Sequence, residues 1–340
     1  MNIQSLPLNI AIFAIAAIVI AIVGTRMAKV TDQLAEKTGW GQAIVGAVFL
    51  GGSTSLSGIV TSVTAAAGGH VELAVSNAVG GIAAQTAFLA IADISYRKAN
   101  LEHAAASIAN LVQGTLLMSL LAIPLLAASS PQVSFRGIHP ATVVIIAAYI
   151  FGLRLVAQAR EKNMWSPRQT KLTNIEETST EQISTSLSTL WTQFVIYALL
   201  VAASGYIIAQ SGLNIASITG ISESIVGGLF TAVSTSLPEL VTTIAAISRG
   251  ALTLAVGGVI GGNCFDLLLL AFSDIAYRKG SIYGAIGNRQ IFVMALTILM
   301  TGTLLLGLLQ REEKGIGNIG FESVLILLLY VGGVVLLFIP

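Results

Sequence analysis

Residues 44–98 begin with IVGAVFLGGSTSLSGIVTS and end with LAIADISYRK, and residues 225–279 begin with IVGGLFTAVSTSLPELVTT and end with LAFSDIAYRK. The two segments align without a gap, and about 24 of their 55 positions are identical. Two unrelated apolar segments of similar composition would not match at one fixed offset. The likeness is therefore the signature of an internal repeat.

The composition around the repeat is that of an integral membrane protein. Hydrophobic residues make up 55% of the 340 residues and charged residues only 10%, whereas soluble domains carry about 25% charged residues. With a mean hydropathy of +0.86, a soluble protein would expose large apolar patches. The net charge of +1 gives no basic field for nucleic acid. One cysteine and three histidines exclude an intrachain disulfide and leave little for a Cys/His metal cage.

A spanning helix needs about 20 mostly apolar residues, and ten stretches meet this requirement. They lie at about 7–24, 41–67, 71–95, 102–127, 138–159, 190–210, 222–248, 251–275, 289–309 and 319–339. The second, third, seventh and eighth are rich in Gly, Ser and Thr, so they are expected at the centre of the bundle. The start of the chain lacks the positively charged region of a signal peptide, so the first span is expected to be retained.

The largest polar break, 160–189, separates two halves, 1–159 and 190–340, with five spans each. Two homologous halves with an odd number of spans must lie in opposite orientations. The sequence therefore predicts an all-α membrane protein with a 5+5 inverted repeat, the arrangement of many secondary transporters. With both termini outside, 13 of the 17 Lys and Arg residues fall on the inner side, as the positive-inside rule requires. The 160–189 linker is then cytoplasmic.

Two carboxylates fall near the middle of predicted spans, Glu239 in the seventh and Asp266 in the eighth. A carboxylate at a helix centre costs roughly 2.5–3.5 kcal/mol on insertion scales, so it usually has a function or a partner. No basic residue is expected at the same depth. Hard cations such as Ca²⁺ and Na⁺ prefer oxygen ligands, so Glu239 and Asp266 are the candidate metal ligands. Pro238 should kink the seventh span and free backbone carbonyls beside them.

The two repeats resemble a known family. TSLPELVTT at 235–243, followed by LAVGGVIGGNCFD at 254–266, resembles the two signature segments of an α-repeat in the sodium/calcium exchanger superfamily. The family pattern is G-T-S-L-P-E, then about twenty residues later G-N-x-x-G-S-N-x-F-D/N. TSLSGIVTS at 54–62 and LAVSNAVGGIAAQ at 73–85 are a degenerate copy.

The resemblance implies antiport of a cation, usually Ca²⁺, against Na⁺, K⁺ or H⁺ at a midplane site between the repeats. The residues it carries over as ion-binding are Thr235, Ser236, Glu239 and Asp266 in the second repeat and Thr54, Ser55, Asn77 and Gln85 in the first. The transported ions are substrates, so no cofactor is implied. The expected partners are inorganic cations and the lipid bilayer, and the oligomeric state is left open.

The first repeat departs from the family pattern. The Pro-Glu pair is Ser57-Gly58, and the two motif serines are Gly81 and Gly262. The cavity then holds a formal charge of −2, which can neutralise one Ca²⁺ or two monovalent ions. Without a proline at position 57, the second span is expected to be less kinked than the seventh.

Three readings of function remain open. The first is an exchanger of calcium for sodium or another monovalent cation, working by alternating access. The second is an exchanger of monovalent cations or protons, and the third is a transport-inactive ion sensor or partner subunit. A channel is disfavoured because the resemblance is to a carrier with an occluding site. An enzyme is not expected, since no nucleophile–base set or phosphate-binding loop stands out. The compact length favours a prokaryotic inner membrane.

Some polar groups have simpler expected roles. Asp93 and Asp274 precede the two Tyr-Arg-Lys runs, where ion pairing at helix ends is expected. His70 and Glu72 are expected in a solvated turn after the second span, and His103 and Glu102 in a solvated loop where the fourth span begins. Gating or pH sensing is the alternative for both, because His titrates near neutral pH.

The topology can be tested directly. A reporter that is active only in the cytoplasm should be active when inserted in 160–189 and silent when fused to the C-terminus, because the positive charges hold the linker inside. The opposite activity pattern would reverse the proposed orientation.

Overall fold

The computed structural model describes residues 3–39, 44–96, 99–105, 107–131, 133–161, 166–168, 170, 173, 185–313, 315 and 319–339. The regular structure of these residues is helical. The elements are α1 (Leu6–Val19), η1 (Ile20–Gly24), α2 (Thr25–Thr38), α3 (Ile44–Thr54), α4 (Leu56–Ala67), α5 (Val71–Ser95), α6 (Leu101–Ala104), α7 (Ile108–Ser129), α8 (Pro140–Glu161), α9 (Leu187–Thr219), α10 (Glu223–Ile225), η2 (Val226–Thr231), α11 (Ala232–Thr235), α12 (Leu237–Ser248), α13 (Leu252–Ala276), η3 (Ile282–Ala285), α14 (Asn288–Gln310) and α15 (Phe321–Leu337). The elements η1 and η2 are π-helical turns, and η3 is a 3₁₀ turn.

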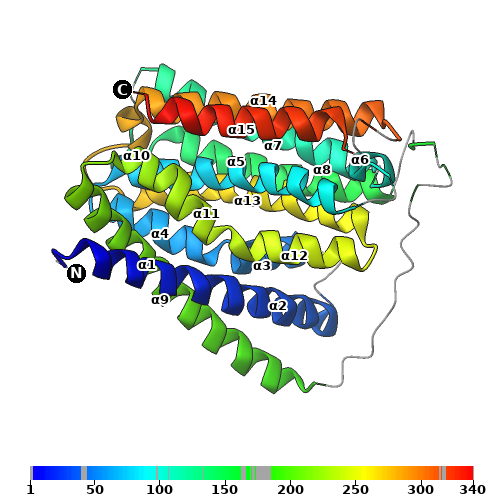
Figure 1. Cartoon of the computed structure of the whole chain (residues 1–340), viewed down its shortest axis with the longest axis horizontal. Coiled ribbons are helices and arrows are strands. Elements are labelled where there is room, and N and C mark those ends of the chain that lie inside the picture. Colours follow the sequence, from blue (N-terminus) through cyan, green and yellow to red (C-terminus); the bar gives the residue numbers. More distant parts are fainter. Residues whose placement is uncertain are drawn as a thin grey trace.

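The helices form one elongated bundle, with both chain ends at the same end of it (Figure 1). Seven of the described helices are long and apolar enough to cross a membrane, and two bent pairs raise this number to nine. The 17-residue α15 supplies a tenth apolar segment. The all-α fold of about ten spans is therefore confirmed. The first helix is longer than predicted, because α1, η1 and α2 form one 33-residue element that includes part of an expected inner loop.

The helices α5 and α13 form the centre of the bundle, as their Gly, Ser and Thr content predicted. In the most apolar stretch of α5, 94% of the residues are buried, and in that of α13, 78% are buried. In the corresponding stretch of the first helix, only 17% of the residues are buried. The turn before α5 lies against the end of α13, because a Cβ built on Gly69 would be 2.9 Å from Nζ of Lys279. The two helices are therefore antiparallel, as an inverted repeat requires.

Both Ser-Thr-Ser-Leu runs interrupt their spans. The pair α3–α4 bends by 67° at Ser55, and the pair ending in α11 and α12 bends by 43° at Ser236. Both serines have nearly the same backbone angles, with φ of −84° and −95° and ψ near 5°. The expectation of a less kinked second span was wrong, because its bend is the larger one. The serine turn makes the break in both repeats, and Pro238 is not needed for it.

Each break is covered by a glycine on a helix from the other half of the chain. A Cβ on Gly24 would lie 2.6 Å from Cγ of Pro238, and a Cβ on Gly205 would lie 2.7 Å from the carbonyl oxygen of Ser57. Both pairs are related by the offset of the sequence repeat. Thr61 also donates a hydrogen bond of 2.9 Å to the Gly205 carbonyl. The halves therefore interlock, with η1 and α2 against α12 and with α9 against α4.

Asp93 and Asp274 connect the ends of α5 and α13 to the following helices. Asp93 accepts backbone N–H bonds from Leu101 at 2.7 Å and Gly320 at 3.2 Å. Asp274 accepts the corresponding bonds from Ile282 and His139, both at 2.8 Å. The expected ion pairing is corrected: these carboxylates cap backbone amides, and the described part of the chain shows no ion pair for either one.

The close contact at Gly205 predicts a loss of stability. Gly205→Ala places a methyl group against a backbone carbonyl that is already part of the helix break, and overpacking of this kind costs about 1–3 kcal/mol. Gly332→Ala is the matched control, because nothing lies within 4 Å of its Cβ position on α15. The thermal midpoint of the detergent-solubilised protein should fall for the first variant and not for the second. Equal midpoints would contradict the interlocked packing.

Candidate ion-binding site

A small cavity lies between the two helix breaks and the central helices. It has a volume of about 10 Å³ for a water-sized sphere, which is room for about one water molecule or dehydrated cation. Its lining consists of Ser55, Gly58, Asn77, Ala78, Gly81, Gln85, Thr235, Ser236, Glu239, Asp266 and Leu269. Both repeats contribute, so the site exists only in the packed pair.

Asp266 is held by groups from the other repeat. Ser55 donates to one carboxylate oxygen at 2.5 Å, and the Gln85 amide donates to the other at 2.7 Å. The same amide nitrogen lies 3.2 Å from the hydroxyl of Ser236. Gln85 and Asp266 occupy equivalent positions of the two repeats, so the acid of one repeat is bonded to the amide that replaces it in the other.

Glu239 is buried but has fewer partners. Its Oε2 atom has no hydrogen-bond partner among the described residues, and the same holds for Oε1 of Gln85. The ion pair found in the described part of the chain joins His70 and Glu223, so neither Glu239 nor Asp266 has a basic side-chain partner there. An uncompensated carboxylate in a dry site is costly, and a bound cation or a proton would remove that cost.

Asn77 connects α5 to both breaks. Its amide nitrogen donates to the Ser62 hydroxyl at 2.9 Å and to the Gly58 carbonyl at 3.4 Å. Its amide oxygen accepts a hydrogen bond of 2.7 Å from Thr231, and the Thr235 hydroxyl lies at 3.5 Å. The Asn77 side chain thereby connects α5 to the backbone of α4 and to the threonine hydroxyls before the second break.

Seven of the eight residues carried over from the family line this cavity. They are Ser55, Asn77, Gln85, Thr235, Ser236, Glu239 and Asp266. Thr54 is not among the lining residues, and its hydroxyl donates to the Leu50 and Gly51 carbonyls of its own helix. Sequence reasoning missed Ser62 and Thr231, which hold Asn77. No repeat signal marks Thr231, because its equivalent position is Leu50.

Position 58 faces the same cavity as Glu239, to which it corresponds. A Cβ built on Gly58 would lie 3.1 Å from Cδ2 of Leu269, 3.9 Å from the Thr235 hydroxyl and 4.0 Å from the Asn77 amide nitrogen. A side chain at this position would therefore enter the cavity after a small shift of the flexible Leu269.

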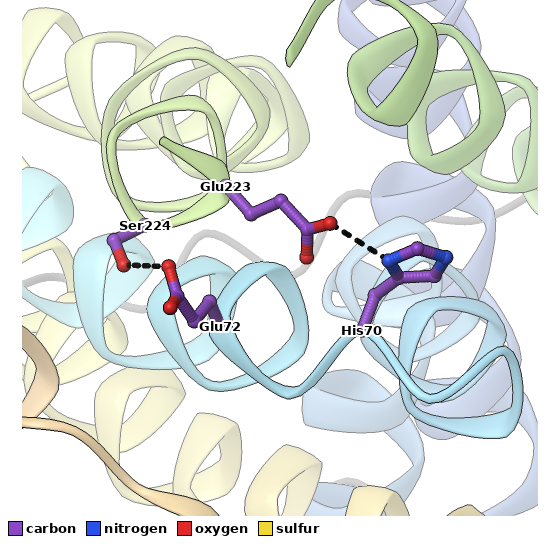
Figure 2. Close-up of polar contacts among 4 residues, drawn as sticks. All are labelled: His70, Glu72, Glu223 and Ser224. Atoms are coloured by element: carbon purple, nitrogen blue, oxygen red, sulfur yellow. Dashed lines mark hydrogen bonds and ion pairs between the residues drawn. The ribbon is translucent and has the colours of Figure 1, made fainter. Parts of the chain in front are cut away.

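A second polar cluster lies where α5 and α10 begin. Figure 2 shows His70 pointing at Glu223, with Nδ1 and Oε1 2.8 Å apart, and Ser224 donating to Glu72 at 2.6 Å. The Gln290 amide also donates to Ser224, at 2.8 Å. The turn is exposed to solvent, as expected, and it is also paired across the two halves, beside a pocket of about 540 Å³.

Comparison with known proteins agrees with this geometry. The family model described as sodium/calcium exchanger protein matches residues 8–158 and 189–339. The chain belongs to the sodium/calcium exchanger family. A relative named putative antiporter CaxA, from Alkalimonas amylolytica, is 31% identical over 153 residues, which is 44% of this chain and 46% of that protein. The match therefore spans about half of the relative's length.

Solved structures share the fold. The sodium-calcium exchanger NCX_Mj, soaked with 10 mM Na⁺ and zero Ca²⁺, superposes with a TM-score of 0.60 at 21% identity, covering 97% of this chain and 99% of that one. The H⁺/Ca²⁺ exchanger CAX gives a TM-score of 0.66 at 14% identity, covering 96% and 82%. The chain is thus a multi-pass membrane protein of an exchanger family, and its repeats extend over both halves.

Restoring a carboxylate at position 58 should strengthen divalent binding. At an effective dielectric near 20, two unit charges 4 Å apart interact by about 4 kcal/mol, and desolvation offsets much of this. We expect Gly58→Glu to bind Ca²⁺ about tenfold more tightly than Gly58→Gln, a difference of about 1.4 kcal/mol. The glutamine variant has the same shape without the charge. Isothermal titration of the two purified variants decides the point, and equal affinities would show that position 58 does not face the ion.

Proposed function

We propose that this chain is a secondary active cation antiporter that exchanges calcium for sodium or another monovalent cation. One observation carries the proposal. Two buried carboxylates, Glu239 and Asp266, line one cavity between two helix breaks, and neither has a basic partner among the described residues. Family membership and the exchanger fold support the same function. An exchanger binds and releases its ions unchanged, so no enzymatic role is proposed.

The charge of the cavity sets what it can hold. With both carboxylates ionised the formal charge is −2, which matches one Ca²⁺ or two monovalent ions. Around them lie the oxygens of Ser55, Thr235 and Ser236, and Ca²⁺ takes about 6–8 oxygen ligands. Ions that need the same oxygens exclude one another. Competition for one set of ligands is the physical basis of exchange in alternating access.

Ion binding would require a rearrangement of Gln85. Its amide nitrogen, a donor, now bonds to Asp266, and its amide oxygen is buried without a partner among the described residues. Turning the amide would present the oxygen to a cation and release one Asp266 oxygen for coordination. The hydroxyl of Ser55 can rotate in the same way, because it donates to Asp266 but can also accept.

A second candidate function is exchange of monovalent cations or protons. The Oε2 atom of Glu239 favours it, because this atom has no hydrogen-bond partner among the described residues and can take up a proton. The glycine at position 58 favours it as well, because a cavity with fewer carboxylates binds a divalent ion less tightly. The third reading, a transport-inactive member, predicts binding without flux. The proposed membrane is the prokaryotic inner membrane, with the linker in the cytoplasm and both termini outside.

Neutralising either acid should stop exchange. Glu239→Gln and Asp266→Asn each remove half of the cavity charge, and we expect each to lower cation-driven flux by more than tenfold, since even about 1.4 kcal/mol of lost binding is tenfold. Flux of radiolabelled calcium and sodium into proteoliposomes measures this. Glu36→Gln is the matched control, because Glu36 is exposed on α2.

The driving gradient separates the candidates. Calcium uptake driven by a sodium gradient supports the first function, and uptake driven only by a pH gradient supports the second. Normal flux in both acid variants would show that the ion site is elsewhere, and absence of flux in the wild type would favour the inactive member.

A further inference from the structure

A second buried acidic pair lies at the end of the bundle where α5 stops. Glu102 on α6 and Glu322 at the start of α15 are each only 1% exposed. Figure 1 places α6 at the opposite end from the chain termini. The pair takes no part in the ion cavity, whose lining contains neither residue.

The repeat shows that the fold does not need these carboxyls. Asp93 next to them caps the helices just as Asp274 does at the other end. In the equivalent places, however, Glu102 corresponds to Tyr283 and Glu322 to Ala141. The second end of the bundle is therefore built with no carboxyl at these two positions. Glu102 and Glu322 are therefore extra carboxyl groups at a helix junction whose equivalent at the other end of the bundle packs without any.

The oxygens of the pair lack donors. Neither oxygen of Glu102 has a hydrogen-bond partner among the described residues, and Oε2 of Glu322 has none either. Asp93 cannot supply one, because its oxygens accept the backbone bonds described above. An ionised carboxylate is only an acceptor, so two of them cannot bond to each other. One added proton changes this, because the two carboxyl groups lie within hydrogen-bond reach and Glu102 can then donate to Glu322.

The charged groups around the pair do not compensate it within the described chain. Asp93 adds negative charge, as does the exposed Glu312 near Glu322. The Arg311 guanidinium donates to the carbonyls of Arg168 and His103 and to the Thr173 hydroxyl. The His103 ring contacts the Arg311 carbonyl and the Thr170 hydroxyl. None of these described contacts involves the oxygens of Glu102.

We propose that Glu102 and Glu322 form a proton-binding site, separate from the cation cavity, that holds one shared proton at neutral pH. Release of the proton leaves two buried negative charges beside Asp93. Their repulsion then separates α6 from the start of α15, so this junction loosens as pH rises.

The direction of the pH dependence follows from linkage. Burial first, and then the charges of Asp93 and Glu322, raise the pKa of Glu102 well above its ordinary range. Between the unfolded pKa and this raised value, the folded protein keeps a proton that the unfolded chain has released. Stability therefore falls as pH rises, by about tenfold in the folding equilibrium per pH unit across that window.

Infrared spectroscopy and thermal unfolding test the site in the full-length protein. The band of a protonated carboxylic acid should be present in the wild type at about pH 7 and reduced in Glu102→Gln. As pH rises above 4.5, the ordinary pKa of a glutamate, the thermal midpoint of the wild type should fall more steeply than that of Glu102→Gln, which resembles the protonated state permanently. Glu313→Gln, at an exposed position, should leave both readouts as in the wild type.

The outcomes are decisive in each direction. An unchanged acid band in Glu102→Gln, or a pH slope equal to that of the wild type, would overturn the proposal. If Glu102→Gln does not fold, Glu322→Gln serves for the same two measurements, because removing either carboxyl removes the shared proton. Neither readout depends on transport, so a failure here is distinct from a failure of the proposed antiport.

Discussion

A helix that stops inside a bilayer leaves backbone carbonyls and amides that lipid cannot bond, and each unsatisfied group costs several kcal/mol. This constraint governs the centre of the molecule. The Ser57 hydroxyl donates to the Thr235 carbonyl at 3.1 Å, so a side chain beside one break satisfies the backbone of the other. The Asn77 amide adds a hydrogen bond from α5 to the Gly58 carbonyl of α4. Neither break could stand alone, and the glycine contacts that interlock the halves keep lipid away from both.

The difference between the halves then shapes the cavity. At each of two equivalent pairs, one repeat has an acid and the other does not. Asp266 faces its equivalent, Gln85, and the two are hydrogen-bonded. Glu239 lines the cavity together with its equivalent, Gly58, and keeps an oxygen without a partner among the described residues. One carboxylate is therefore already held by protein donors, while the other remains open to a cation or a proton.

Much of this could be predicted from the sequence, because a repeat at a fixed offset and intramembrane carboxylates are strong signals. The central helices and seven cavity residues followed from them. The relative size of the two bends was predicted wrongly, because the prediction relied on Pro238, while the serine turn that breaks both spans has no local signature. The partners of Asp93 and Asp274 were missed because backbone amides leave no mark in a sequence. Glu102 was expected in a solvated loop, and this was wrong, since its burial depends on α15, more than two hundred residues away.

The unequal bends have a consequence of their own. In the proposed alternating access, exchanging the conformations of the two halves turns an inverted repeat upside down, so the bends of 67° and 43° would be interchanged in the opposite-facing form. The exchange is imperfect here, because Pro238 lacks the backbone N–H that Ser57 keeps, so the two hinges are not equally restricted. The two facing forms then differ in energy, and such a molecule has a resting side even when no ion is bound.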